Sequence, residues 1–129
     1  TANIVVTLSV AVDRCAISVW RAVNEVSATP HATASDTTVS IGVLSTTINI
    51  PDIGWVVAIS GTGAQVTPTG DTWVGVTEQY GGVWGDAAGV SRTGGFASGL
   101  VLETGRTVSV TYAATTPPTA GSLAAMSWG

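Results

Sequence analysis

Apolar residues alternate with Thr and Ser over much of this 129-residue chain, at a period of two. The pattern is clearest in residues 4–12 (Ile-Val-Val-Thr-Leu-Ser-Val-Ala-Val) and 106–112 (Arg-Thr-Val-Ser-Val-Thr-Tyr). Such alternation is typical of a β-strand with one buried and one exposed face. No helical period extends beyond a turn or two, so the sequence predicts an all-β protein.

Short strands bounded by Gly, Pro, Asp and Asn can be delimited along the chain. We expect them at about 3–12, 15–23, 38–50, 54–60, 73–80, 87–93, 96–103, 106–114 and 120–128. The phase of the alternation slips near Leu44, which indicates a bulge or two short strands. The nearly all-apolar segment 54–60 predicts a central strand covered on both faces.

The segments between these strands are rich in turn-forming residues. Residues 24–37 have no clean period and predict a long irregular connection, and residues 61–71 and 81–86 predict loops. Tight turns are expected at Pro51-Asp52, at Thr93-Gly94-Gly95 and at Glu103-Thr104-Gly105.

About eight to ten short strands predict one antiparallel β-sandwich domain over residues 1–129, of jelly-roll type. An immunoglobulin-like sandwich is the near alternative, although the Cys…Trp…Cys spacing of antibody domains is absent. The chain opens at Thr1 inside strand-like sequence. This start indicates processing or the C-terminal part of a longer chain.

Charged residues make up only 9% of the chain, which contains no Lys, four Arg and eight acids. Because a surface with few charges is weakly protected against association, we expect much of it to face other subunits. The alternative is a monomer whose Thr-rich surface is simply neutral. The scattered Arg residues argue against nucleic acid binding. No apolar run reaches the roughly 18 residues that a membrane-spanning helix needs.

The chain has little equipment for catalysis, because it holds one His and one Cys. That excludes a conventional zinc site and a disulfide framework within one chain. Cys15 lies in an apolar run and is expected to be a small buried hydrophobe. A hydrolytic triad would have to use His31, whose irregular surroundings are a poor place to fix catalytic geometry. We expect a solvated loop residue there, and no enzyme.

Three acids, Asp71, Glu78 and Asp86, fall close enough in sequence to converge on a calcium ion across loops. No Asp-x-Asp-x-Asp spacing supports such a site. The favoured interpretation is turn capping by Asp71 and Asp86 and a solvated strand end for Glu78. We therefore expect no metal and no cofactor.

The aromatic residues are the strongest candidates for binding. Four of the five Trp lie in strand patterns and are expected in the core or in subunit interfaces: Trp20, Trp55, Trp73 and Trp128. Trp84 instead lies in a glycine-rich segment, with Tyr80 four residues before it. An exposed Trp–Tyr pair could stack on a sugar ring or anchor a protein contact. The alternative is a loop tip folded back on the sheet.

Several segments together resemble a recurring β-rich domain of tailed bacteriophages and prophages. They are Asp-Thr-Trp-Val-Gly-Val-Thr-Glu-Gln-Tyr at 71–80, Glu-Thr-Gly-Arg-Thr-Val-Ser-Val-Thr-Tyr at 103–112, the closing Ala-Ala-Met-Ser-Trp at 124–128 and the Cys-Ala-Ile-Ser-Val-Trp-Arg strand at 15–21. The resemblance implies a structural component on the virion surface, as head decoration, capsid spike or tail fibre. It implies other virion proteins as partners, a homo-oligomer (a trimer is favoured) and no catalytic residues. The alternative is a module that binds a host-surface glycan through Trp84 and Tyr80.

Overall fold

The computed structural model describes residues 27–38, 42–63, 70–84, 90–113 and 120–129, together with Val5, Thr7, Val19 and Trp20. It describes only the backbone at Thr38, Gly70, 83–84 and 90–92. The strands expected at 3–12 and 15–23 and the buried Cys15 therefore lie outside the described residues, apart from four single positions.

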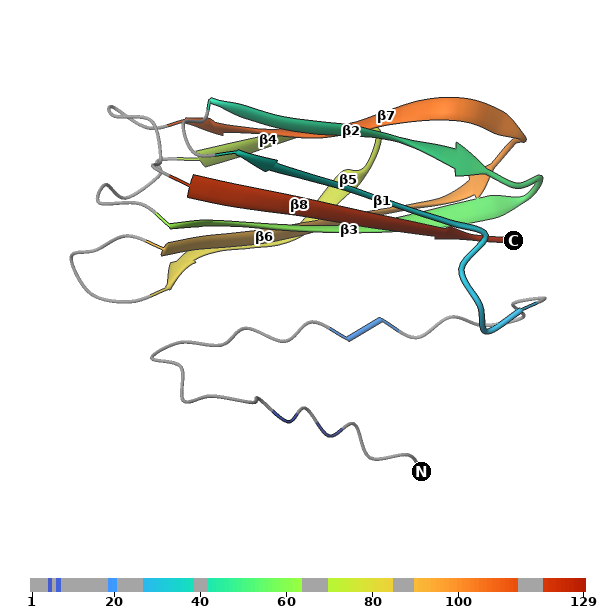
Figure 1. Ribbon diagram of the computed structural model, residues 1–129, viewed down its shortest axis with the longest axis horizontal. Coiled ribbons are helices and arrows are strands. Elements are labelled where there is room, and N and C mark those ends of the chain that lie inside the picture. The colour runs from blue at the N-terminus through green and yellow to red at the C-terminus, as the bar shows by residue number, and fades with distance from the viewer. Residues whose placement is uncertain are drawn as a thin grey trace.

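Eight strands and no helix make up the described part of the chain. They are β1 (Ala32–Thr38), β2 (Val43–Ile50), β3 (Gly54–Gly63), β4 (Gly70–Val74), β5 (Thr77–Trp84), β6 (Val90–Leu100), β7 (Glu103–Ala113) and β8 (Ala120–Trp128). The large sheet has the order β1-β8-β3-β6-β5, and the small sheet has the order β2-β7-β4. In Figure 1 the small sheet lies at the top of the view, above the large one.

All pairings in both sheets are antiparallel. The first described strand pairs with the last, and the second pairs with the last but one, which is the jelly-roll arrangement. The predicted all-β sandwich is therefore confirmed. The strand expected at 120–128 and the turn at Pro51-Asp52 are also found, the latter with the amide of Gly54 donating to the Pro51 carbonyl at 3.0 Å.

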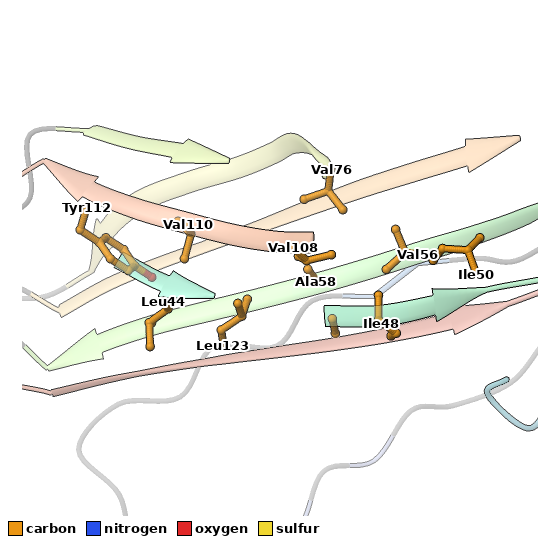
Figure 2. Packing of buried hydrophobic residues seen from close by; sticks show 11 residues of the cluster. Leu44, Ile48, Ile50, Val56, Ala58, Val76, Val108, Val110, Tyr112 and Leu123 are labelled. Carbon is orange, nitrogen blue, oxygen red and sulfur yellow. The ribbon is translucent and has the colours of Figure 1, made fainter. Parts of the chain in front are cut away.

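The core lies between the two sheets and takes one face of each (Figure 2). Its residues are Leu44, Ile48, Ile50, Val56, Ala58, Val76, Val108, Val110, Tyr112, Leu123 and Ala125. In β7 the period-two pattern predicted this outcome, because Val108 and Val110 are buried while Thr107 and Thr111 are exposed. Removal of such apolar surface from water, at about 25 cal/mol per Å², is the main force that holds the sheets together.

Buried hydroxyl groups also join the two sheets. The Tyr112 hydroxyl donates to Ser60 Oγ at 2.6 Å, and Ser60 Oγ donates to the carbonyl of Ser122 at 2.7 Å. Near the other end of the core, Ser127 Oγ donates to the carbonyl of Asn49 at 2.7 Å. Since buried polar groups are costly without partners, these bonds explain how Ser can occupy core positions.

The prediction of an irregular connection over 24–37 is wrong, because β1 occupies Ala32–Thr38. Ala32 and Ala34 pack against the core, and Thr33 between them points outward. Alanine is too small to mark an apolar face in the sequence, so the alternation was present but weak. The slip expected near Leu44 depends on Val39 and Ile41, which lie outside the described residues. β2 itself is one strand, and its register shift falls between Ile48 and Ile50.

The strand expected over 73–80 is two strands in different sheets. Gly75 has a φ of 83°, which ends β4 and turns the chain from the small sheet toward β5 in the large one. A Cβ at this position would collide with the carbonyl oxygen of Thr107. Glycine is therefore required here by both conformation and space. β5 then continues to Trp84, through the segment expected to form a loop.

The turn expected at Thr93-Gly94-Gly95 is wrong, because β6 runs without a break from Val90 to Leu100. A Cβ on Gly94 would lie 2.6 Å from the Tyr80 ring, and one on Gly95 would lie 2.5 Å from Val76. These glycines allow close approach of side chains rather than reversal of the chain. The turn expected at 103–105 is wrong as well, since β7 already begins at Glu103.

Candidate interaction face

The outward face of the large sheet is apolar and aromatic around the first residues of β3 and the last residues of β8. Trp55 of β3 and Trp128 of β8 are register partners, and their rings stack with centroids 4.4 Å apart and planes 12° apart. Phe96 of β6 tilts against Trp55 at a centroid distance of 6.1 Å. We define the aromatic face by these three residues with Val57, Ile59 and Met126, which take the outward positions that follow in the same strands.

This face is open to solvent, because Met126 is 41% and Ile59 is 43% exposed. β3 is central in its sheet, as predicted, but the prediction that both its faces are covered is wrong. An open apolar face and a covered one leave the same nearly continuous apolar run in the sequence. Phe96 of β6 and Met126 of β8 were not among the predicted interface residues. The signal that could have identified them is that they alternate with core positions along their strands.

The outward face of the small sheet differs in kind. Its outward positions carry hydroxyl groups, and we call it the threonine face, formed by Ser45, Thr47, Thr72, Thr107, Ser109 and Thr111. Two valines, Val43 and Val74, lie exposed among them. The sandwich thus presents an apolar surface on one side and a neutral, hydrogen-bonding surface on the other.

Tyr80 lies on the edge strand β5 of the large sheet, level with Gly94 and Ile59, and its ring contacts Trp20. The two ring centroids are 6.0 Å apart, with planes at 38°. Tyr80 is half-buried because its ring lies over Gly94 in the neighbouring strand. Trp84 ends β5, where its backbone pairs with Val90, and its side chain lies outside the described part of the structure. The predicted Trp84–Tyr80 platform therefore stays a prediction.

Trp73 takes a different place from Trp55 and Trp128, since it packs against the core between the sheets. Its Nε1 donates to Thr93 Oγ1 at 2.9 Å. The Thr93 hydroxyl is fully buried and lies 3.0 Å from the carbonyl of Tyr80 and 3.3 Å from Glu78 Oε1. This polar cluster fixes β4 of the small sheet against β6 of the large one.

Asp71 lies beside this cluster, and one of its carboxylate oxygens is buried. Burial raises the pKa of the Asp71 carboxyl, and the negative charge of Glu78 raises it further, while a hydrogen bond with Thr93 opposes the shift. Two of the three acids considered for calcium are therefore close enough to interact. Asp86 lies outside the described residues. Across the described ranges, no group of three or more His, Cys, Asp or Glu side chains could hold a metal ion.

His31 lies at the start of β1, where it is exposed and its amide donates to the carbonyl of Ser127 at 2.7 Å. The polar residues near it in sequence serve the backbone instead. Ser27 Oγ accepts from the amide of Thr29 at 3.0 Å, and the Asp36 carboxylate accepts from the amide of Ser45 at 2.8 Å. The bond to Ser27 stabilises the local backbone, and the bond to Asp36 links β1 of the large sheet to β2 of the small sheet.

Comparison of the chain with protein-family models, with curated proteins and with solved structures finds no match. In the described part of the chain, no helix has the length and apolar character needed to cross a membrane. The two faces of the sandwich and the Trp20–Tyr80 pair are therefore the features that bear on function.

Proposed function

We propose that this chain is a structural component on the outside of a bacteriophage virion, as head decoration, capsid spike or tail fibre, and that it acts by subunit assembly. The observation that carries the proposal is the aromatic face. Large exposed apolar patches are rare on monomeric proteins and mark contact surfaces. Tryptophan is enriched among the residues that dominate binding energy, so the Trp55–Trp128 stack is the centre of the proposed contact.

The apolar surface continues from this stack onto two loops at the same end of the sandwich. One loop carries Ile53, directly before β3, and the other carries Val101 and Leu102, directly after β6. These three side chains are 79%, 74% and 71% exposed. The loops lie side by side because Gly54 and Leu100 are register partners. A subunit seated on the stack would cover these side chains as well.

The threonine face suits the outside of such a particle. Its hydroxyl groups bind water without adding charge. On the other side, the outward positions of β1, β3 and β8 carry no charge that would repel a second copy, and β6 places Arg92 beside Gly61, away from the Trp stack. The proposed partners are further copies of the chain, in a trimer, and other virion structural proteins.

The fold adds support of a weaker kind. Jelly rolls are found among viral capsid and lectin domains, but one fold serves many functions. The sequence resemblance to tailed-phage structural domains points the same way. Both arguments rest on analogy, whereas the aromatic face is a property of this chain.

The first test is the copy number of the chain in purified virions, measured by quantitative mass spectrometry against the major capsid protein. Hundreds of copies would support a decoration or shell protein, and three to a few dozen would support a fibre or spike. Absence of the chain from the particles would overturn the location.

Sedimentation of the purified protein tests the assembly mechanism separately. Trp128→Ser should shift the oligomer toward monomer, by about tenfold or more in dissociation constant, because a central contact is lost. Val74→Ser is the matched control, since it also replaces an exposed apolar residue, but on the threonine face. A wild-type protein that stays monomeric at high concentration contradicts the mechanism, as does equal weakening by the two variants.

Binding of a host-surface glycan is the second candidate function. Its support is the aromatic pair of Trp20 and Tyr80, which borders a groove on the large sheet. A tail fibre can both assemble and bind a receptor, so the two candidates are compatible.

A further inference from the structure

A groove of about 540 Å³ lies on the outward face of the large sheet, along β3 from Ile59 to its last residue, Gly63. Gly61 and Gly63 of β3 form its floor with Ala120 and Ser122 of β8. A Cβ on Gly63 would meet no other atom within 4 Å, so the space above this glycine is open. The groove exists because its floor residues are too small to fill it, and its volume is that of a small-molecule site.

Two aromatic rings form the wall of this groove. Trp20 and Tyr80 both line it, with their ring planes tilted at 38° to each other. Tyr80 cannot settle deeper into the sheet, because its ring already lies over the backbone of Gly94. A ring held in this way presents an apolar surface of fixed position to a ligand in the groove.

The polar groups at the groove are neutral. Ser122 is exposed and offers a hydroxyl, while its carbonyl is occupied by the bond from Ser60 Oγ at 2.7 Å. The described residues that line the groove carry no charge. Arg92 of β6 is the register partner of Gly61, and its side chain lies outside the described part of the structure. Among the described lining residues, an ionic ligand would lose its hydration without gaining an opposite charge.

We infer that this groove binds a neutral saccharide, with a pyranose ring stacked on Trp20 or Tyr80 and its hydroxyl groups over Gly61, Gly63 and Ser122. The chemistry fits in two respects: aromatic rings take the apolar C–H face of a sugar, and a hydroxyl-bearing floor takes its polar edge. The inference deepens the glycan-binding candidate above and does not rest on self-association. The far end of the groove, at Gly63, lies about 26 Å from the Trp stack, because eight residues of extended β3 separate Trp55 from Gly63. Its near end includes Ile59, which also belongs to the aromatic face.

The test uses the full chain and a panel of methyl glycosides of glucose, galactose, mannose and N-acetylglucosamine, with sialic acid as the anionic comparison. Binding is followed by amide chemical shifts in NMR titrations. We expect at least one neutral glycoside to shift the amides of Gly61, Gly63 and Ser122, and sialic acid to shift none of them. Absence of a response to every neutral glycoside at high millimolar concentration overturns the inference.

Two glycine variants locate the site. Gly63→Val should fill the groove and weaken binding by about tenfold or more, while the open space around it and the strand preference of Val leave the fold intact. Gly42→Val is the matched control, because a Cβ there also meets nothing within 4 Å and Gly42 lies outside the groove. Unchanged affinity in Gly63→Val overturns the placement of the site.

Removal of the aromatic wall gives an independent readout. Trp20→Ala should weaken the same glycoside by roughly three- to tenfold through loss of stacking. Sedimentation of the same samples separates the alternatives. Groove shifts that follow protein concentration without sugar would mean that a second copy occupies the groove, which overturns the saccharide assignment. A protein that stays monomeric yet binds the glycoside would contradict only the assembly proposal.

Discussion

The indole ring of Trp55 lies stacked on that of Trp128, although one comes from the third described strand and the other from the last. The stack brings two large apolar surfaces together at the sheet surface. We expect Trp55→Ala and Trp128→Ala each to lower the free energy of unfolding by about 1–2 kcal/mol, less than in a sealed core because both rings are half-exposed.

A double-mutant cycle on this pair should give a coupling of about 0.5–1.5 kcal/mol in urea unfolding of the monomer. Trp55 and Trp73 form the matched control pair, since Trp73 packs on the opposite side of the large sheet. Their coupling should be close to zero. Equal coupling in the two cycles would show that the stack contributes no specific stability.

Gly75 and Gly105 both have a positive φ. Alanine substitutions at these two positions distinguish the cost of backbone strain from the cost of a steric collision. Gly105→Ala should lower the free energy of unfolding by about 1 kcal/mol, because its φ of 74° is unfavourable for Ala but the space around it is open. Gly75→Ala should lower it by about 3 kcal/mol or more, since the new methyl group also meets the Thr107 carbonyl. If the two variants lose similar amounts of stability in chemical denaturation, the close approach of Gly75 to the Thr107 carbonyl is contradicted.

The buried side of Asp71 predicts a pH dependence of stability. Because the folded protein raises the pKa of this carboxyl, the folded state holds the proton more tightly than the unfolded state. Tighter proton binding by Asp71 therefore stabilises the folded state. This contribution is complete below the ordinary aspartate pKa of about 4, and it is lost as the pH rises through the higher pKa of the folded state.

Asp71→Asn removes the charge and should be more stable than the wild type at neutral pH. That advantage should shrink as the pH falls toward 4 in urea unfolding series. Asp52→Asn is the control, because Asp52 is an exposed turn residue. An advantage of Asp71→Asn that is constant with pH would contradict the assigned pKa direction.

Ile53 is a β-branched residue with a φ of 56°, in the left-handed region. Its side chain is 79% exposed, so packing does not compensate the strain. Ile53→Gly should raise the free energy of unfolding by about 0.5–1 kcal/mol. Ile53→Val, which keeps the branched Cβ, should leave it nearly unchanged. If Ile53 serves in the proposed contact, Ile53→Gly should also weaken self-association, so a stabilised and less associated variant is the expected result.

The sequence predicted the fold class because period two survives wherever the inward residue is large. β7 and β8 show this, with Val108, Val110 and Leu123 marking the core face. Prediction failed where that contrast was weak. The inward face of β1 carries Ala32, Ala34 and Asp36, none of which marks an apolar face. Gly94 and Gly95 look like a turn in the sequence because their role depends on Tyr80 and Val76, which are distant in sequence.

The candidate site was predictable only in its residue types. Trp residues were expected at interfaces, but their spacing does not say which face of a sheet they occupy. Register decides that Trp55 meets Trp128 outside and that Trp73 points inward to Thr93. The pairing of Tyr80 with Trp20 likewise depends on a segment that precedes β1 and lies far from β5 in sequence.

The place of β8 in the large sheet has a consequence for biosynthesis. This last strand lies between β1 and β3, so β1 has no neighbour in that sheet until residues 120–128 have left the ribosome. Domains rich in such distant pairings fold slowly. Until β8 is available, β1 and one edge of β3 lack their partner, whereas β3, β6 and β5 can already pair with one another. We therefore expect insertion of β8 between β1 and β3 to be the slow step of folding.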